Sequence, residues 1–199
     1  MKNVMKIAIG LMVAATAVAS AQDQKEKYFK KDSSYKTTYV RFGSAAMPVD
    51  DSYVIAPGVS AGWQYRENRQ GVDISVSGAK ASKESNEALS FTLPKVQYLA
   101  FLQDNKPSNR HNAYFGLGGS LYGINVDQEK KNDKDETVIE RTQEYTGLAA
   151  NASIGYNYKL GKKLQSTIQL GANMPTPLAF NSKGTVYKPS FELSLGLGF

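Results

Sequence analysis

The chain has 199 residues, no cysteine and a formal net charge of +6. Without cysteine it can form no disulfide scaffold, thiolate metal site or cysteine nucleophile. Its mild positive charge is not gathered into a basic face with stacking aromatics, so we expect no nucleic-acid partner. The twelve tyrosines against one tryptophan, together with 17 glycines, are typical of bacterial outer-membrane barrels, although a secreted soluble β-protein could share this composition.

Residues 1–21 have the pattern of a secretory signal peptide. Lys2 and Lys6 form a positive n-region, the apolar run 7–19 is too short to span a bilayer as a helix, and residues 19–21 read Ala-Ser-Ala, which fits an A-x-A cleavage site. We expect cleavage after Ala21; an uncleaved N-terminal anchor is the alternative. No later apolar run approaches about 20 residues, so the mature chain could cross a membrane only as a closed barrel.

The mature sequence divides into an arm and eight alternating segments. Residues 22–34 are charged and aperiodic, which favours a flexible periplasmic arm. Beyond the arm, apolar residues alternate with small or polar ones at a period of two, which indicates β-strands. The expected strands are about 35–44, 55–66, 72–80, 89–102, 113–123, 145–158, 164–173 and 190–199. Pro94 interrupts the alternation of the fourth, where we expect a bulge that changes the facing.

The connections between these segments alternate in length and polarity. Those after the second and sixth strands are short, the one after the fourth is intermediate, and the other four are longer or more polar. Short turns at one end and long loops at the other are the asymmetry of an outer-membrane barrel. With both termini in the periplasm, the longest polar stretch, loop 126–143, would lie outside the cell and is a candidate for contact with an extracellular partner.

Which way the apolar residues of each strand point, outward or inward, separates two kinds of barrel. A membrane barrel turns its leucines to lipid and its polar residues to the lumen. A soluble lipocalin-like barrel does the reverse and carries many Lys and Glu outside. The polar faces here hold mainly Gly, Ser, Thr, Asn and Gln. We therefore predict an all-β fold over residues 35–199, an eight-stranded antiparallel up-and-down transmembrane β-barrel.

Two sets of side chains stand out on these faces. The first is a lumen charge network of Arg41, Asp73, Lys95 and Glu192, with Arg66 as a less certain member. It can form two opposite-sign pairs, which are either a structural polar plug or the gate of a narrow pore. The second is an interfacial girdle of aromatic residues at the periplasmic strand ends, formed mainly by Trp63, Tyr65, Tyr156 and Tyr158.

The sequence offers no complete catalytic, cofactor-binding or metal site. The single histidine, His111, lies in a predicted turn; Ser108 shares that turn, and Ser120 is expected toward the opposite end of its strand. A hydrolytic histidine needs a serine beside it and an orienting group, and neither is apparent. The acidic residues of loop 126–143 do not have EF-hand spacing. We expect no enzyme and no cofactor; a lipid-modifying barrel enzyme is an alternative.

On its eight alternating segments, its signal peptide and its final ELSLGLGF, the chain resembles the small eight-stranded outer-membrane proteins of OmpA/OmpX type. Its PGVSAGWQYR, FTLPKVQYL and YFGLGGS segments are similar to parts of small outer-membrane proteins of chlamydiae. The resemblance implies a monomer in outer-membrane lipid with a structural or surface-interaction role, a narrow passive pore being the alternative. It also implies recognition by the outer-membrane assembly machinery, through an assembly signal of Leu193, Leu195, Leu197 and Phe199.

Overall fold

The computed structural model describes residues 34–199, except for 50–51, 84–85, 107, 132–136, 162–163 and 185–186. The expected signal peptide and nearly all of the expected arm lie outside the described residues. The chain forms eight strands: β1 (Ser34–Val49), β2 (Ser52–Glu67), β3 (Gln70–Lys83), β4 (Asn86–Phe101), β5 (His111–Lys131), β6 (Thr137–Lys159), β7 (Gln165–Lys183) and β8 (Ser190–Gly198). Among the described residues, no helix has the length and hydropathy that crossing a membrane requires.

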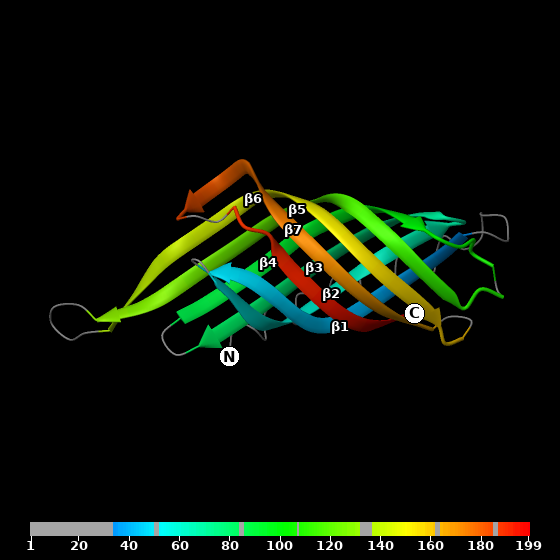
Figure 1. Cartoon of the computed structure of the whole chain (residues 1–199), viewed down its shortest axis with the longest axis horizontal. Coiled ribbons are helices and arrows are strands. Elements are labelled where there is room, and N and C mark those ends of the chain that lie inside the picture. The colour runs from blue at the N-terminus through cyan, green and yellow to red at the C-terminus, as the bar shows by residue number, and fades with distance from the viewer. Residues whose placement is uncertain are drawn as a thin grey trace, which may run out of the picture.

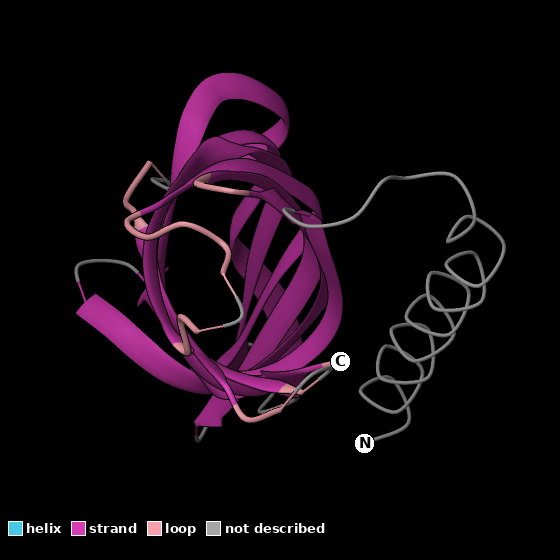
Figure 2. Cartoon of the chain, turned by 90° about the vertical axis from the view of Figure 1, so that its right-hand side faces the viewer, coloured by secondary structure: helices cyan, strands magenta, loops and turns pink. Residues whose placement is uncertain are grey.

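The strands close into one antiparallel up-and-down barrel, which confirms the predicted fold class (Figures 1 and 2). Each strand pairs with its sequence neighbours, and β1 pairs with β8, for example Phe42 opposite Leu195. The seam is completed where the N–H of Thr38 donates to the carbonyl of Phe199 at 2.9 Å and the N–H of Phe199 donates to the carbonyl of Thr38 at 2.8 Å. Closure gives every strand two neighbours, although β7 pairs with β8 only as far as Asn173.

We call the end of the barrel that holds Ser34 and Phe199 the terminal end, and the opposite end the hairpin end. The connections 68–69, 102–110 and 160–164 lie at the terminal end, and β5, β6 and β7 extend furthest at the hairpin end (Figure 1). The longest connection, 102–110, therefore follows β4 at the terminal end, where we expected only an intermediate one. The asymmetry of this barrel lies in the length of its strands rather than of its loops.

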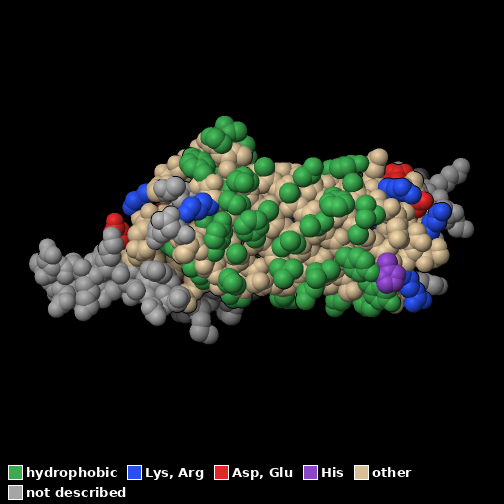
Figure 3. Space-filling view, in the orientation of Figure 1, with side chains coloured by type: hydrophobic (Ala, Val, Ile, Leu, Met, Phe, Trp, Pro, Cys, Tyr) green, Lys and Arg blue, Asp and Glu red, His purple; other side chains and the backbone are tan. Residues whose placement is uncertain are grey.

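The alternation of each strand sorts its side chains as expected for a membrane barrel. Leu193, Leu195 and Leu197 are about half-exposed on the outside, whereas Gln97, Asn151 and Gln169 are buried in the lumen. On the face seen in Figure 3, hydrophobic side chains form a broad band across the middle of the barrel, and charged ones gather toward its two ends. This arrangement is the reverse of a soluble lipocalin-like barrel.

The predicted irregularity of β4 is present. The register of β4 against both neighbours shifts around Pro94, between Ser75 and Ser77 of β3 and between Thr92 and Lys95 of β4. The buried parity changes there, from Ser90 and Thr92 to Lys95 and Gln97. The bulge therefore lets both halves of β4 keep their polar residues inside.

At the hairpin end, the structure corrects the expected loops. β1 runs on to Val49, and most of the predicted loop 126–143 is the paired ends of β5 and β6, in which Asp127 and Arg141 form a cross-strand ion pair at 2.8 Å. The expected loop after the seventh strand is likewise part of β7. The physical reason is burial, because side chains such as Met47, Ile124 and Val126 continue the inward parity and pack together.

Candidate functional site

The lumen is the best-defined candidate site, and its side chains change character along the axis. At the terminal end, the buried Arg66 of β2 stacks over the Phe101 ring at 4.0 Å and donates hydrogen bonds to the carbonyls of Asn68 and Gln103 and to Asn112 Oδ1. Arg66 thus ties the turn 68–69 and the segment 102–110 to the barrel mouth.

The segment 102–110 is held from a second side as well. Lys159 Nζ donates to Asn105 Oδ1 at 3.1 Å and to the carbonyl of Lys106 at 3.3 Å. Arg69 donates to Asp104 at 2.7 Å, and this hydrogen bond and charge hold the pKa of the Asp104 carboxyl below its ordinary value. Cationic side chains therefore fasten this segment at the terminal mouth.

Half of the predicted charge network lies deeper, around the ring of Tyr39. The Arg41 guanidinium stacks over this ring at 3.7 Å and donates to Gln169 Oε1 and to Tyr114 Oη. The Tyr39 hydroxyl lies 2.8 Å from both carboxylate oxygens of Asp73, to which it donates. Arg41 and Asp73 thus meet through Tyr39, and no direct ion pair joins them in the described part of the chain.

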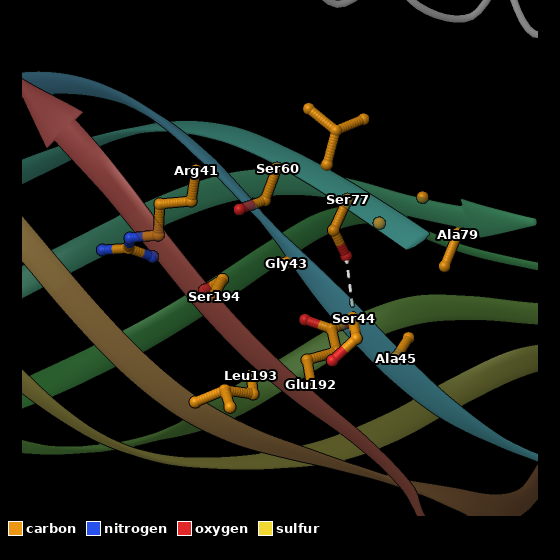
Figure 4. Close-up of a pocket in the computed structure, with 13 residues that line it drawn as sticks. Arg41, Gly43, Ser44, Ala45, Ser60, Ser77, Ala79, Glu192, Leu193 and Ser194 are labelled. Atoms are coloured by element: carbon orange, nitrogen blue, oxygen red, sulfur yellow. Dashed lines mark hydrogen bonds between the residues drawn. The ribbon is translucent and has the colours of Figure 1, made fainter. Parts of the chain in front are cut away.

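The other two predicted members come together further toward the hairpin end. Lys95 Nζ lies 3.7 Å from Glu192 Oε2, and Glu192 Oε1 accepts hydrogen bonds from Ser77 at 3.1 Å and Asn173 at 3.2 Å. Figure 4 shows Ser77 directed at Glu192 beside a small cavity of about 20 Å³, with Arg41 on its far side. Mostly glycine, alanine and serine residues line this cavity, which leaves room beside Glu192 for water.

Beyond the ion pair, the lumen becomes apolar. One connected cluster of buried side chains draws members from β1 to β6, and Ala179 of β7 packs against it. We call it the apolar cluster: Ala45, Met47, Val49, Ala56, Ala79, Ala81, Ala88, Tyr122, Ile124, Val126, Tyr145 and Ala149. Sequence reasoning missed it because several members lie in stretches that we expected to be loops. The sequence did contain a sign of it: Ala45, Met47 and Val49 continue the alternation that places Arg41 on the inner face, which indicates that the strand extends to Val49.

The predicted girdle lies on the outer face toward the terminal end. The rings of Trp63 and Tyr65 stack 6.1 Å apart, and both Tyr156 and Tyr158 contact His111, whose ring centroid is 5.9 and 4.9 Å from theirs. His111 also hydrogen-bonds to the Tyr156 hydroxyl through Nδ1. The histidine is thus the first residue of β5 and a neighbour of the girdle, rather than part of a turn.

The two serines that we considered as partners of His111 lie elsewhere. Ser108 is exposed in the segment 102–110, and Ser120 is buried in the lumen. Among the described contacts of His111 there is no serine, only the two tyrosines. The arrangement is an aromatic cluster on the outer face, and no serine–histidine pair of a hydrolytic site forms among the described residues.

The residues of the expected assembly signal all lie on the outside of β8. Leu193, Leu195, Leu197 and Phe199 are 49–59 % exposed. Their side chains share the outer face. The seam between β8 and β1 is formed by backbone hydrogen bonds, not by these side chains. Their side chains are therefore available for contact with lipid or with another protein.

The hairpin end carries exposed apolar side chains of a different kind. Ile139 of β6, Leu178 and Phe180 of β7 are 65–72 % exposed, on strand extensions that run beyond the first residue of β8. In Figure 1 the end of β7 bends away from the barrel axis. Charged residues, including Arg141, Asp127 and Lys183, lie around the same extensions.

Solved structures with this fold are outer-membrane proteins. Neisserial surface protein A aligns with a TM-score of 0.63 and 13% identity over 84% of this chain and 98% of that chain. Ail, the attachment invasion locus protein of Yersinia pestis, aligns with a TM-score of 0.54 and 10% identity over the same shares. Ail in complex with the heparin analogue sucrose octasulfate gives a TM-score of 0.53 and 10% identity, again over 84% of this chain and 98% of that chain.

At these identities the likeness is one of fold. The chain has the architecture of the small eight-stranded outer-membrane barrels of OmpA/OmpX type. No protein-family model matches it, and no curated protein matches its sequence. The function must therefore be argued from the residues of the barrel itself.

Proposed function

We propose that this chain is an integral outer-membrane barrel with a closed lumen, which acts without enzymatic chemistry as a structural or surface-interaction protein. One observation carries the proposal: an apolar outer band surrounds a filled lumen, and strand extensions with their own packed core project from one end. The proposal includes cleavage of a signal peptide after Ala21, outer-membrane lipid as the surroundings, and assembly by the outer-membrane machinery.

The closed lumen is supported by how its cross-section is filled. Tyr39, Tyr114, Tyr122 and Tyr145 are each at most 1 % exposed, and Arg41 and Arg66 stack on aromatic rings. An eight-stranded barrel has an interior just wide enough for side chains to fill. These large rings occupy the space that a permanent pore would need, which disfavours the passive-pore alternative.

The surface role is supported by the hairpin end. The extensions of β5, β6 and β7 are paired strands over the apolar cluster, so they present a fixed shape in place of loose loops. Ile139, Leu178 and Phe180 give this shape an exposed apolar surface. Exposed apolar surfaces of soluble regions commonly mark contact sites. The two proteins of the same fold are named as a surface protein and an attachment invasion protein, which agrees with such a role.

The absence of enzymatic chemistry is supported by the surroundings of the single histidine. His111 contacts Tyr156 and Tyr158 on the outer face, and the buried Ser120 points into the lumen. A lipid-modifying barrel enzyme needs its histidine and serine within hydrogen-bond reach. The ring also closes without a second copy of the chain, in keeping with a monomer.

Single-cysteine labelling on intact cells tests the proposal. Because the chain has no cysteine, Phe180→Cys at the hairpin end and Ser108→Cys at the terminal end each add a single exposed thiol. A membrane-impermeant maleimide should label Phe180→Cys in intact cells, and Ser108→Cys only after lysis. Labelling in the reverse order, or equal labelling of both, would show that the hairpin end is not displayed at the surface.

A further inference from the structure

Three features of the lumen could prevent ions from crossing it: the packed side chains of Tyr39, Arg41 and Tyr114, the Lys95–Glu192 ion pair, and the apolar cluster. We infer that the apolar cluster is the permeability seal and that the lumen charge network contributes only to the structure of a wet chamber behind it. The inference rests on the closed lumen of the proposed function and assigns the closure to particular residues.

The apolar cluster draws on seven of the eight strands at the hairpin end. Its members come from six consecutive strands, and Ala179 of the seventh packs against them. Six alanines form much of its wall, and larger side chains fill it: Met47, Tyr122, Ile124, Val126 and Tyr145, each at most 1 % exposed. It contains no charged or amide side chain. Its polar side-chain atoms are the hydroxyls of Tyr122 and Tyr145, and the buried Gln143 lies opposite Val126 at its edge. An ion that entered it would lose its water and gain few polar ligands, which is how an apolar constriction blocks conduction.

The region of the charge network has the opposite character. Ser75 Oγ, Ser120 Oγ and Asn151 Oδ1 are buried without a hydrogen-bond partner among the described residues, and a cavity of about 20 Å³, enough for at least one water molecule, lies beside Glu192. Buried polar atoms of this kind are normally satisfied by internal water. A chamber that holds water is not itself a barrier to ions.

The contact between Lys95 and Glu192 is also too long for this ion pair alone to close the lumen. Lys95 Nζ and Glu192 Oε2 are 3.7 Å apart, and Glu192 is held as well by Ser77 and Asn173. Replacing both charged groups with amides of similar size would keep the hydrogen-bonding capacity of the chamber. Such a change would leave the apolar cluster, and therefore the seal, intact.

Planar-bilayer recordings of the purified full chain test this assignment. Met47→Ser and Ile124→Ser each replace a fully buried apolar side chain of the cluster with a small polar one. We expect the two changes combined to raise ion conduction at least about tenfold over the wild-type baseline, because the constriction becomes wider and wettable. The matched control, Lys95→Gln combined with Glu192→Gln, should stay at the wild-type baseline.

The outcomes separate the inference from the proposed function. Conduction by the Lys95→Gln/Glu192→Gln variant, or silence of a folded Met47→Ser/Ile124→Ser variant, would overturn the inference while the closed lumen of the wild type stands. Sustained conduction by the wild type would overturn the closed lumen itself. Folding is checked by heat-dependent gel mobility; if the double serine variant does not fold, Met47→Ser alone, which still widens the cluster and adds a hydroxyl to it, replaces it under the same criteria.

Discussion

At the scale of single residues, the lumen is filled by large rings that lie over glycines. Tyr39 of β1 is paired with Gly62 of β2, and Tyr114 of β5 with Gly155 of β6. In both pairs a Cβ on the glycine would overlap the tyrosine side chain. The rings have no room to move away, because both tyrosines are 1 % exposed and Arg41 covers the Tyr39 ring. Glycine on one strand is therefore what allows an aromatic ring on the next.

These pairs give a prediction for stability. Gly62→Ala and Gly155→Ala should each lower the free energy of unfolding by about 1–3 kcal/mol through overpacking, measured by urea titration of the folded barrel in lipid vesicles. The control is Gly171→Ala, a lumenal glycine whose added Cβ would have its nearest neighbour at 3.9 Å. If all three variants have the same free energy of unfolding, the close approach of ring and glycine does not constrain the lumen.

At the scale of elements, prolines stand where pairing between strands stops. β2 is paired with β3 only from Gly58 onward, directly after Pro57. β7 leaves β8 beyond Asn173, just before Pro175 and Pro177. Free strand edges invite pairing with other chains, and proline lacks the N–H that such pairing uses. The prolines thus protect the free edges of the hairpin end.

The same prolines explain which parts of the fold could be predicted from sequence. The strand cores have clean alternation, so their positions and facing were predicted correctly, including the bulge at Pro94. Around Pro48 and Pro175 the same residue type indicated turns, whereas the structure has strands there. Inward packing of distant residues decides these stretches, and a local pattern cannot contain that information. For the same reason the charged residues were found, but their connection through Tyr39 was not.

The last strand gives a prediction that separates assembly from stability. The Phe199 side chain is 59 % exposed, and its seam contacts to Thr38 are backbone hydrogen bonds that any residue can make. If the ring is read by the assembly machinery, Phe199→Ala should slow insertion and increase periplasmic degradation in cells. The free energy of unfolding of the refolded protein should change by less than about 1 kcal/mol.

Pulse-chase insertion and vesicle unfolding measure these two quantities. Phe180→Ala is the matched control, because Phe180 is also largely exposed but lies on β7 at the hairpin end. Normal insertion of Phe199→Ala, or an equal defect in Phe180→Ala, would remove the special role of the last strand.

At the scale of the whole molecule, the barrel has two apolar regions with different partners. The outer band around the middle is exposed in the isolated chain and has the composition of a lipid-facing surface (Figure 3). The apolar cluster inside the hairpin end is buried by the chain's own strands. The strand extensions therefore bury their core without a membrane. The side chains of the outer band leave water only if lipid covers them.

Because only the outer band lies in lipid, a substitution by arginine should lower the free energy of unfolding more in the band than on the strand extensions. Leu195 lies mid-strand in β8, in the outer band, and Leu178 lies on the extension of β7; they are 59 % and 65 % exposed. Leu195→Arg should cost about 2–4 kcal/mol of unfolding free energy in lipid vesicles, and Leu178→Arg about 0–1 kcal/mol. Equal costs at the two positions would mean that the band does not mark the bilayer.

The most direct test of the central claim, that the outer face of this barrel lies in lipid, uses its one tryptophan. Trp63 is on the outer face, stacked on Tyr65 at the expected interface. In vesicles, its fluorescence should be quenched strongly by lipids brominated near the headgroup end of the acyl chain, less by lipids brominated at the chain end, and weakly by aqueous iodide. Quenching by iodide with no effect of either brominated lipid would contradict the membrane barrel.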